Sequence, residues 1–123
     1  SYELKKIEAA EELQIAPVQG DDTLRNWTTI WMVRVGDDIY VRSVSGRSSA
    51  WFRGMQTRHA GRIRAGGVVR DVTFVEESDA EINDQINDAY RTKYSRYSES
   101  IINHINGSDA QAATIKLVPQ EDS

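Results

Sequence analysis

Two tight hairpins constrain the fold of this chain more than any other feature of its sequence. The first joins Thr28–Val35, rich in β-branched and aromatic residues, to Ile39–Val44 through a Gly-Asp-Asp turn. The second joins Gly61–Ala65 to Val68–Val75 through a Gly-Gly turn. Strands connected by so few residues pair antiparallel, so the sequence predicts an antiparallel sheet at the centre of the molecule.

The rest of the chain predicts two further strands and several helices around this sheet. Strand-like segments occupy Leu13–Val18 and Ala113–Val118. Helices are predicted for Tyr2–Ala10, for a turn or two from Ala50, from Asp79 through Tyr97, and for Ser98–Ile105. About six short strands with antiparallel connections indicate an α+β fold built on a small closed or nearly closed antiparallel barrel.

Length and composition fit one compact domain over residues 1–123, with a polar tail from 119 to 123. A chain of 123 residues has room for one core of useful size. No apolar run is long enough to cross a bilayer and no secretory leader is visible, which predicts a cytoplasmic protein without membrane partners. The chain has no cysteine and only two distant histidines, so no metal site is expected.

Positive charge is concentrated in the middle of a chain with a net charge of -4. Seven arginines lie between Ile39 and Arg70, and no acidic residue lies among them. Either these arginines bind an anionic partner, or acids from the helix after Asp79 pair with them. The overall negative charge argues against nucleic acid as the main partner.

The segment from Arg42 to Ser49 is the strongest candidate for a binding site. It combines guanidinium and hydroxyl donors with Gly46 and the start of a predicted helix at Ala50. Such groups make up anion and phosphate sites in proteins. The alternative is a solvated loop whose serines cap the following helix. Trp51, next to this segment, is the aromatic residue best placed to stack on a flat ligand.

No catalytic signature accompanies this candidate site. The chain lacks a nucleophile elbow, a P-loop and a dinucleotide-binding glycine fingerprint. The sequence therefore leaves the catalytic residues unknown, and with them the question of whether the protein is an enzyme.

The sequence resembles an uncharacterised bacterial family, domain of unknown function 2255, over nearly its whole length. The resemblance is carried by these segments: Thr29–Ser43, Gly46-Arg47, Ala50–Gly54, Gly61–Gly67, Arg70–Phe74, Ala89–Tyr94 and Leu117–Pro119. More distantly, this pattern is similar to split β-barrel proteins that bind flavin mononucleotide or a deazaflavin. The resemblance implies a small antiparallel split β-barrel with flanking helices, and a homodimer.

In those split barrels the phosphate end of the cofactor lies against hydroxyl-bearing strands and a Ser/Gly/basic loop. The matching positions here, which the resemblance implies as cofactor-binding residues, are Thr28, Thr29, Arg42, Ser43, Ser45, Gly46, Arg47 and Trp51. Arg42 and Arg47 would hold the phosphate of flavin mononucleotide or a deazaflavin, with hydroxyl groups donating hydrogen bonds to it. Trp51 would flank the ring or the ribityl chain.

Two departures from the split-barrel pattern keep other functions open. The loop is shorter and reads Ser49-Ala50-Trp51-Phe52, and no obvious extra segment covers a flavin ring. With a cofactor, the resemblance implies a nitroreductase-like oxidoreductase that transfers hydride to a small acceptor. Without one, the barrel serves as a non-enzymatic binding or interaction module. A third hypothesis is single-strand nucleic-acid binding, with Trp51 and Tyr40 as stacking surfaces.

Overall fold

The fold is given by a computed structural model that describes residues 2–18, 26–43, 46–48 and 50–119. The helical elements are α1 (Tyr2–Ala9), the 3-10 turn η1 (Gly46–Ser48), α2 (Ala50–Arg58), α3 (Ala80–Lys93), α4 (Glu99–Ile105) and α5 (Ser108–Gln111). The strands are β1 (Leu13–Pro17), β2 (Thr28–Ile30), β3 (Met32–Val35), β4 (Asp38–Arg42), β5 (Ala60–Ala65), β6 (Val68–Glu76) and β7 (Thr114–Pro119). In the part of the chain so described, no helix is long and apolar enough to cross a membrane.

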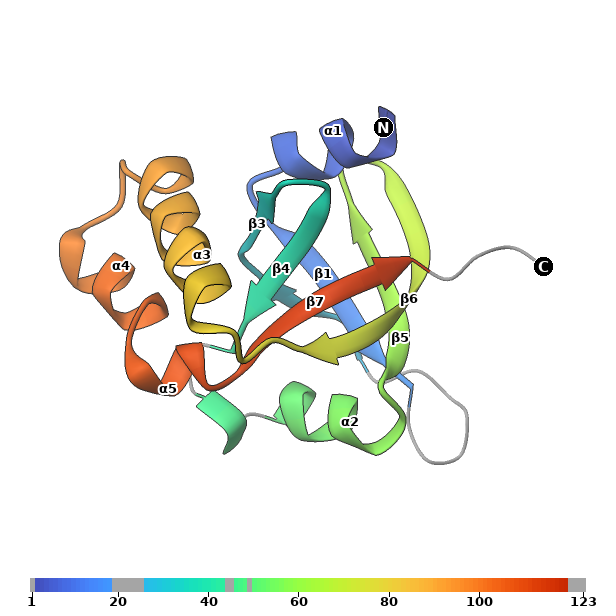
Figure 1. Ribbon diagram of the computed structural model, residues 1–123. Coiled ribbons are helices and arrows are strands. Elements are labelled where there is room, and N and C mark those ends of the chain that lie inside the picture. The colour runs from blue at the N-terminus through green and yellow to red at the C-terminus, as the bar shows by residue number, and fades with distance from the viewer. Residues whose placement is uncertain (1, 19–25, 44–45, 49, 120–123) are drawn as a thin grey trace.

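The strands form one antiparallel sheet in the order β2-β1-β5-β6-β7-β4-β3, which curls into a nearly closed barrel (Figure 1). The two end strands of this order, β2 and β3, follow each other in the chain and are separated only by Trp31. β2 pairs with β1 and β3 pairs with β4. The seam therefore lies at Trp31, where the backbone passes from one edge of the sheet to the other.

This seam corrects one detail of the sequence prediction, which placed a continuous strand over Thr28–Val35. The strand is interrupted at Trp31 because its two halves have different partners: Ile30 lies opposite Leu13, whereas Met32 lies opposite Val41. Both predicted hairpins are confirmed, as β3–β4 and β5–β6. The α+β split-barrel class that the sequence predicted is also confirmed.

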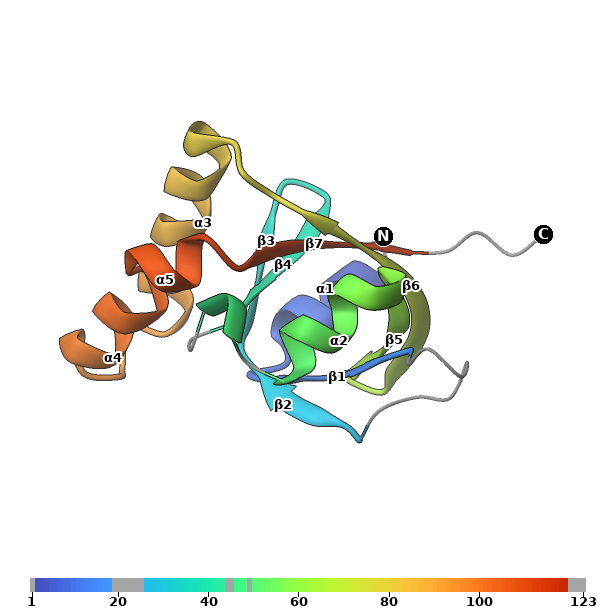
Figure 2. The same cartoon turned by 90° about the horizontal axis from the view of Figure 1, so that it is seen from below.

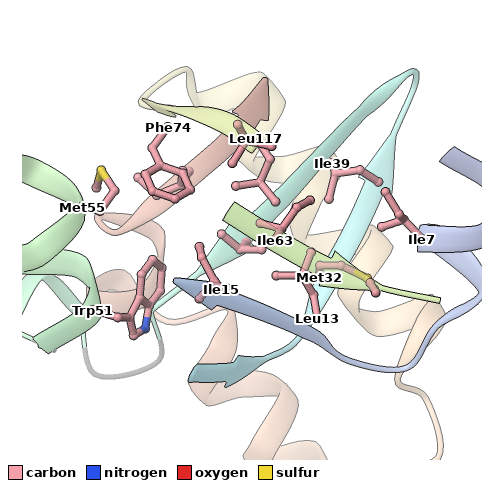
Figure 3. Close-up of a cluster of buried hydrophobic side chains, with 14 of the residues drawn as sticks. Ile7, Leu13, Ile15, Met32, Ile39, Trp51, Met55, Ile63, Phe74 and Leu117 are labelled. Carbon is pink, nitrogen blue, oxygen red and sulfur yellow. The ribbon is translucent and has the colours of Figure 1, made fainter. Parts of the chain in front are cut away.

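The barrel core is closed at its ends by two helices. α1 and α2 lie across opposite ends of the barrel (Figures 1 and 2). Figure 3 shows Ile7 from α1, and Trp51 and Met55 from α2, directed toward the strand residues of the core. The strands supply this core by alternation, as in β5, where Ile63 is buried between the exposed Arg62 and Arg64.

A second apolar cluster joins α3 and α4 to the outside of the barrel. Its buried members are Val33, Tyr40, Ile86, Tyr90, Tyr94, Ile102 and Ile105. The predicted cap of α3 is confirmed, because the Asp79 side chain accepts a hydrogen bond from the backbone N–H of Ile82 at 2.9 Å. α3 ends at Lys93 rather than continuing through Tyr97, and α4 begins at Glu99. The sequence did not predict α5.

Candidate functional site

A cavity of about 750 Å³ lies where the barrel seam meets α4 and the start of α2. Its wall is formed by Glu12, Thr29, Ile30, Trp31, Arg42, Ser43, Trp51, Ser100, Ile101, His104 and Ile105. Five of these eleven residues are aromatic or aliphatic, and the other six carry hydroxyl, carboxylate, guanidinium or imidazole groups. This composition is typical of sites for small organic ligands and cofactors.

The structure places four of the predicted site residues on this wall: Thr29, Arg42, Ser43 and Trp51. Thr28 precedes Thr29 on β2 but does not line the cavity. Gly46 and Arg47 lie in η1 and do not line the cavity, and Gly46 has a positive φ of 78°. Ser45 lies outside the described residues.

Arg42 is fully buried, with 1% of its surface exposed, and its guanidinium hydrogen bonds are with uncharged groups. Nε donates to Thr114 Oγ1 at 2.9 Å, Nη1 to Asn87 Oδ1 at 2.6 Å and Asn106 Oδ1 at 2.9 Å, and Nη2 to Asn83 Oδ1 at 2.8 Å. Backbone carbonyls of Ile105 and Asn83 are further acceptors. The five N–H groups of the guanidinium are thus already engaged.

The positive charge of Arg42 has no carboxylate partner within the described residues. Burial lowers the pKa of Arg42 to about 10, with a smaller opposing effect of the Tyr90 phenol. The guanidinium therefore stays charged at neutral pH. Buried charges in proteins are usually neutralised by a neighbouring charge, so an unneutralised one on a cavity wall favours an anionic occupant.

Two other arginines of the basic segment are paired with acids within the protein. Arg47 Nη1 lies 2.6 Å from Glu76 Oε1 and donates to the carbonyl of Ala112 at 2.9 Å. Arg62 lies 2.8 Å from Asp71. One prediction from the sequence placed the pairing acids in the helix after Asp79, but these two acids lie on β6. Arg47 would have to leave Glu76 to reach a ligand in the cavity.

Trp31 is a cavity residue whose position is fixed by aromatic stacking. Its ring lies parallel to that of Tyr94, with 4.0 Å between centroids and an interplanar angle of 5°. Tyr97 packs against the same tryptophan at 4.8 Å. Tyr94 is itself held by hydrogen bonds from its hydroxyl to the carbonyl of Glu11 at 2.6 Å and from the backbone N–H of Met32 at 3.2 Å. The site thus has a rigid aromatic surface at the seam.

Sequence reasoning missed the contribution of α4 to the site. Ser100, Ile101 and His104 line the cavity, although the chain had seemed to lack a covering segment. Ile101 is 47% exposed, so its side chain presents apolar surface on the cavity wall. No sequence signal links α4 to Arg42, because their contact depends on the Ile105 carbonyl and on the side chain of Asn106 at the end of the helix.

Solved structures with this fold include proteins named for different ligands. HutZ, the haem storage protein from Vibrio cholerae, superposes with a TM-score of 0.72 at 14% identity, covering 96% of this chain and 87% of that one. An FAD-binding protein from Mesorhizobium loti gives 0.61 at 14% identity, covering 98% and 90%. An F420 reductase gives 0.62 at 13% identity, covering 95% and 92%. At these identities the likeness shows a shared fold.

No curated protein matches this sequence. A sequence profile, however, covers nearly the whole chain, matching residues 3–117. It describes an uncharacterised protein conserved in bacteria. The family resemblance drawn from the hairpin, arginine and tyrosine segments is thereby confirmed, and the chain belongs to the bacterial family DUF2255.

Proposed function

We propose that this protein binds a flat, anionic aromatic cofactor of the flavin or deazaflavin class in the cavity at the barrel seam. The observation that carries the proposal is the buried Arg42, whose charge lies on the cavity wall without a carboxylate partner among the described residues. The aromatic rings of Trp31 and Trp51 on the same wall suit a planar ligand. The flavin- and F420-named neighbours support this cofactor class.

Within this proposal, each wall residue has a stated role. Arg42 acts through its electric field rather than by new hydrogen bonds, because its donors are occupied. Thr29 and Ser43 supply hydroxyl groups to the anionic end, and Trp51 flanks the ring or its side chain. A bound flavin supplies hydride chemistry, and the protein orients it and shields it from water. A phosphorylated ligand, a homodimer and a cytoplasmic location belong to the same proposal.

Titration with flavin mononucleotide and with a deazaflavin cofactor, followed by tryptophan fluorescence, tests this function. We expect saturable quenching at micromolar ligand. Ile101→Glu, which adds a negative charge at the partly exposed cavity wall, should weaken binding about tenfold or more. The matched control is Val69→Glu on β6, a 57% exposed position that does not line the cavity. Absence of quenching by both ligands would refute the proposal.

His104 on the cavity wall supports haem as a second candidate ligand. Histidine is a common axial ligand of haem iron, and the aliphatic lining would suit a porphyrin. The haem storage protein among the structural neighbours shares this barrel. Haem titration of His104→Ala, compared with His59→Ala, decides between the two candidates. If His104→Ala loses the shift of the haem Soret band and His59→Ala keeps it, haem is favoured. If both variants bind flavin as tightly as the wild-type protein does, flavin is favoured.

If neither ligand binds, the remaining hypothesis is a non-enzymatic interaction module that retains the barrel. Single-strand nucleic-acid binding is less favoured, because two of the seven arginines, Arg47 and Arg62, are paired with Glu76 and Asp71. A filter-binding assay with oligonucleotides at low and high salt would check this point.

A further inference from the structure

A second cavity, separate from the seam site, lies between α1, β3 and α3. Its volume is about 530 Å³. The apolar part of its wall comes from Val33, Val35 and Ala89, and its charged groups are Glu8, Arg34, Asp88 and Lys93. None of these residues lines the seam cavity.

Lys93 is the chemically distinctive group of this second cavity. Its amine donates to the Met32 carbonyl at 3.0 Å and contacts Met32 Sδ at 2.7 Å. The amine also lies over the Tyr94 ring, 5.3 Å from its centroid. Within the described residues, no carboxylate lies within ion-pair distance of this amine.

The electrostatic surroundings favour the neutral amine. Burial lowers the pKa of Lys93 to about 8, and the nearby Glu8 carboxylate opposes this effect only in part. Of the other charged groups facing the cavity, Arg34 is paired with Glu8 at 3.1 Å and with Asp37 at 3.2 Å, and Asp88 is paired with Arg91. A substantial fraction of Lys93 is therefore uncharged near pH 8, where an ordinary lysine is almost entirely protonated.

We propose that this cavity is a site where Lys93 captures small uncharged carbonyl compounds as an imine. Lysine amines freed of their proton are the nucleophiles that proteins use toward aldehydes and ketones. The apolar wall suits a short alkyl chain. An anionic carbonyl compound would meet the carboxylates of Glu8 and Asp88, so the site favours uncharged ones.

The capture step balances without an oxidant or a reductant. The Lys93 nitrogen lone pair forms a bond to the carbonyl carbon, and the carbonyl π electrons move to oxygen. A proton passes from nitrogen to that oxygen. The remaining nitrogen proton then passes to this hydroxyl, which leaves as water, and a neutral carbon–nitrogen double bond remains.

Reductive trapping tests this proposal with the intact protein. The protein is incubated with propanal and cyanoborohydride at pH 8, and alkylation of each lysine is measured by peptide mass spectrometry. Lys93 should be modified about tenfold or more faster than Lys5 and Lys116, with a rate that rises around pH 8. Lys93→Arg should lose this fast site while Lys116→Arg keeps it, and circular dichroism checks that both variants fold.

A second aldehyde separates a cavity site from a merely reactive amine. Glyoxylate carries a carboxylate, so its preference for Lys93 over Lys5 should be clearly smaller than that of propanal. If propanal modifies Lys93 no faster than Lys5 and Lys116, the proposal is overturned. Equal preference of both aldehydes for Lys93 would overturn the assignment of an uncharged ligand.

Discussion

Arg42 Nη2 lies 2.8 Å from the side-chain oxygen of Asn83, which joins a strand of the barrel to the first turn of α3 through an uncharged partner. The same guanidinium contacts Asn87 further along α3 and Asn106 at the end of α4. One buried side chain therefore holds both helices against β4. The arrangement shapes the seam cavity and leaves a positive charge on its wall.

Replacing Arg42 with methionine should destabilise the protein strongly. The substitution leaves the buried polar groups of Asn83 and Thr114 without their donor, and the expected loss is about 3 kcal/mol or more in the free energy of unfolding. Urea denaturation measures it. Arg62→Met, which removes an exposed ion pair with Asp71, should cost no more than about 1 kcal/mol. Equal losses in the two variants would contradict the role given to Arg42.

Tyr94→Phe should weaken the seam while keeping its ring stack. The variant retains the contact with Trp31 but loses the hydroxyl that bonds to the Glu11 carbonyl and to the backbone N–H of Met32. We expect a loss of about 1–3 kcal/mol in thermal or urea unfolding, because buried backbone groups are left unpaired. Tyr97→Phe, at a more exposed position, is the comparison and should lose less.

Gly61 should tolerate no side chain. A Cβ at this position would lie 2.6 Å from the Ala16 carbonyl oxygen and 2.7 Å from the Phe74 ring. Gly61→Ala should therefore cost about 1–3 kcal/mol by overpacking β5 against β1. In Gly36→Ala the added methyl group meets no atom within 4 Å, and only the positive φ of 62° opposes it. A Gly61 variant with wild-type stability would show that the strands separate more easily than the structure indicates.

The pH dependence of stability should carry a contribution from Lys93. Its pKa is about 8 in the folded protein, below the ordinary value of 10.5, so the unfolded chain binds more protons between these values. This group therefore makes the folded state more stable as pH rises from about 8 to 10.5. In Lys93→Met that increment should be absent, measured as the difference in unfolding free energy from the wild-type protein. Parallel profiles of the two proteins would contradict the shifted pKa.

Local sequence patterns predicted most of the fold because the information for hairpins and helices is itself local. The two turns, the alternation in β5 and the Asp79 cap all act over a few residues. The break at Trp31 was not predictable in this way, since Thr28–Val35 reads as one continuous strand. The seam is revealed only by strand pairing. The first half pairs with β1, which precedes it in the chain, and the second half pairs with β4, which follows it.

The candidate site was predicted only in part, because sequence patterns report on neighbouring residues and not on distant contacts. Eight candidate residues could be read from the sequence, and four of them, Arg42 included, do line the cavity. The burial of Arg42 could not be predicted from the sequence, because its hydrogen-bond acceptors come from α3, α4 and β7, more than 40 positions away in the chain. An arginine in a serine-rich loop region resembles an exposed phosphate ligand until its amide partners are known.

The most direct test of the central claim compares the affinities of flavin mononucleotide and riboflavin, which share the ring and differ by the phosphate. The central proposal is that the unneutralised charge of Arg42 on the cavity wall selects an anionic flat ligand. Calorimetric or fluorescence titration should therefore give a Kd for flavin mononucleotide about tenfold or more below that for riboflavin. Equal affinities, or no binding of either compound, would contradict it.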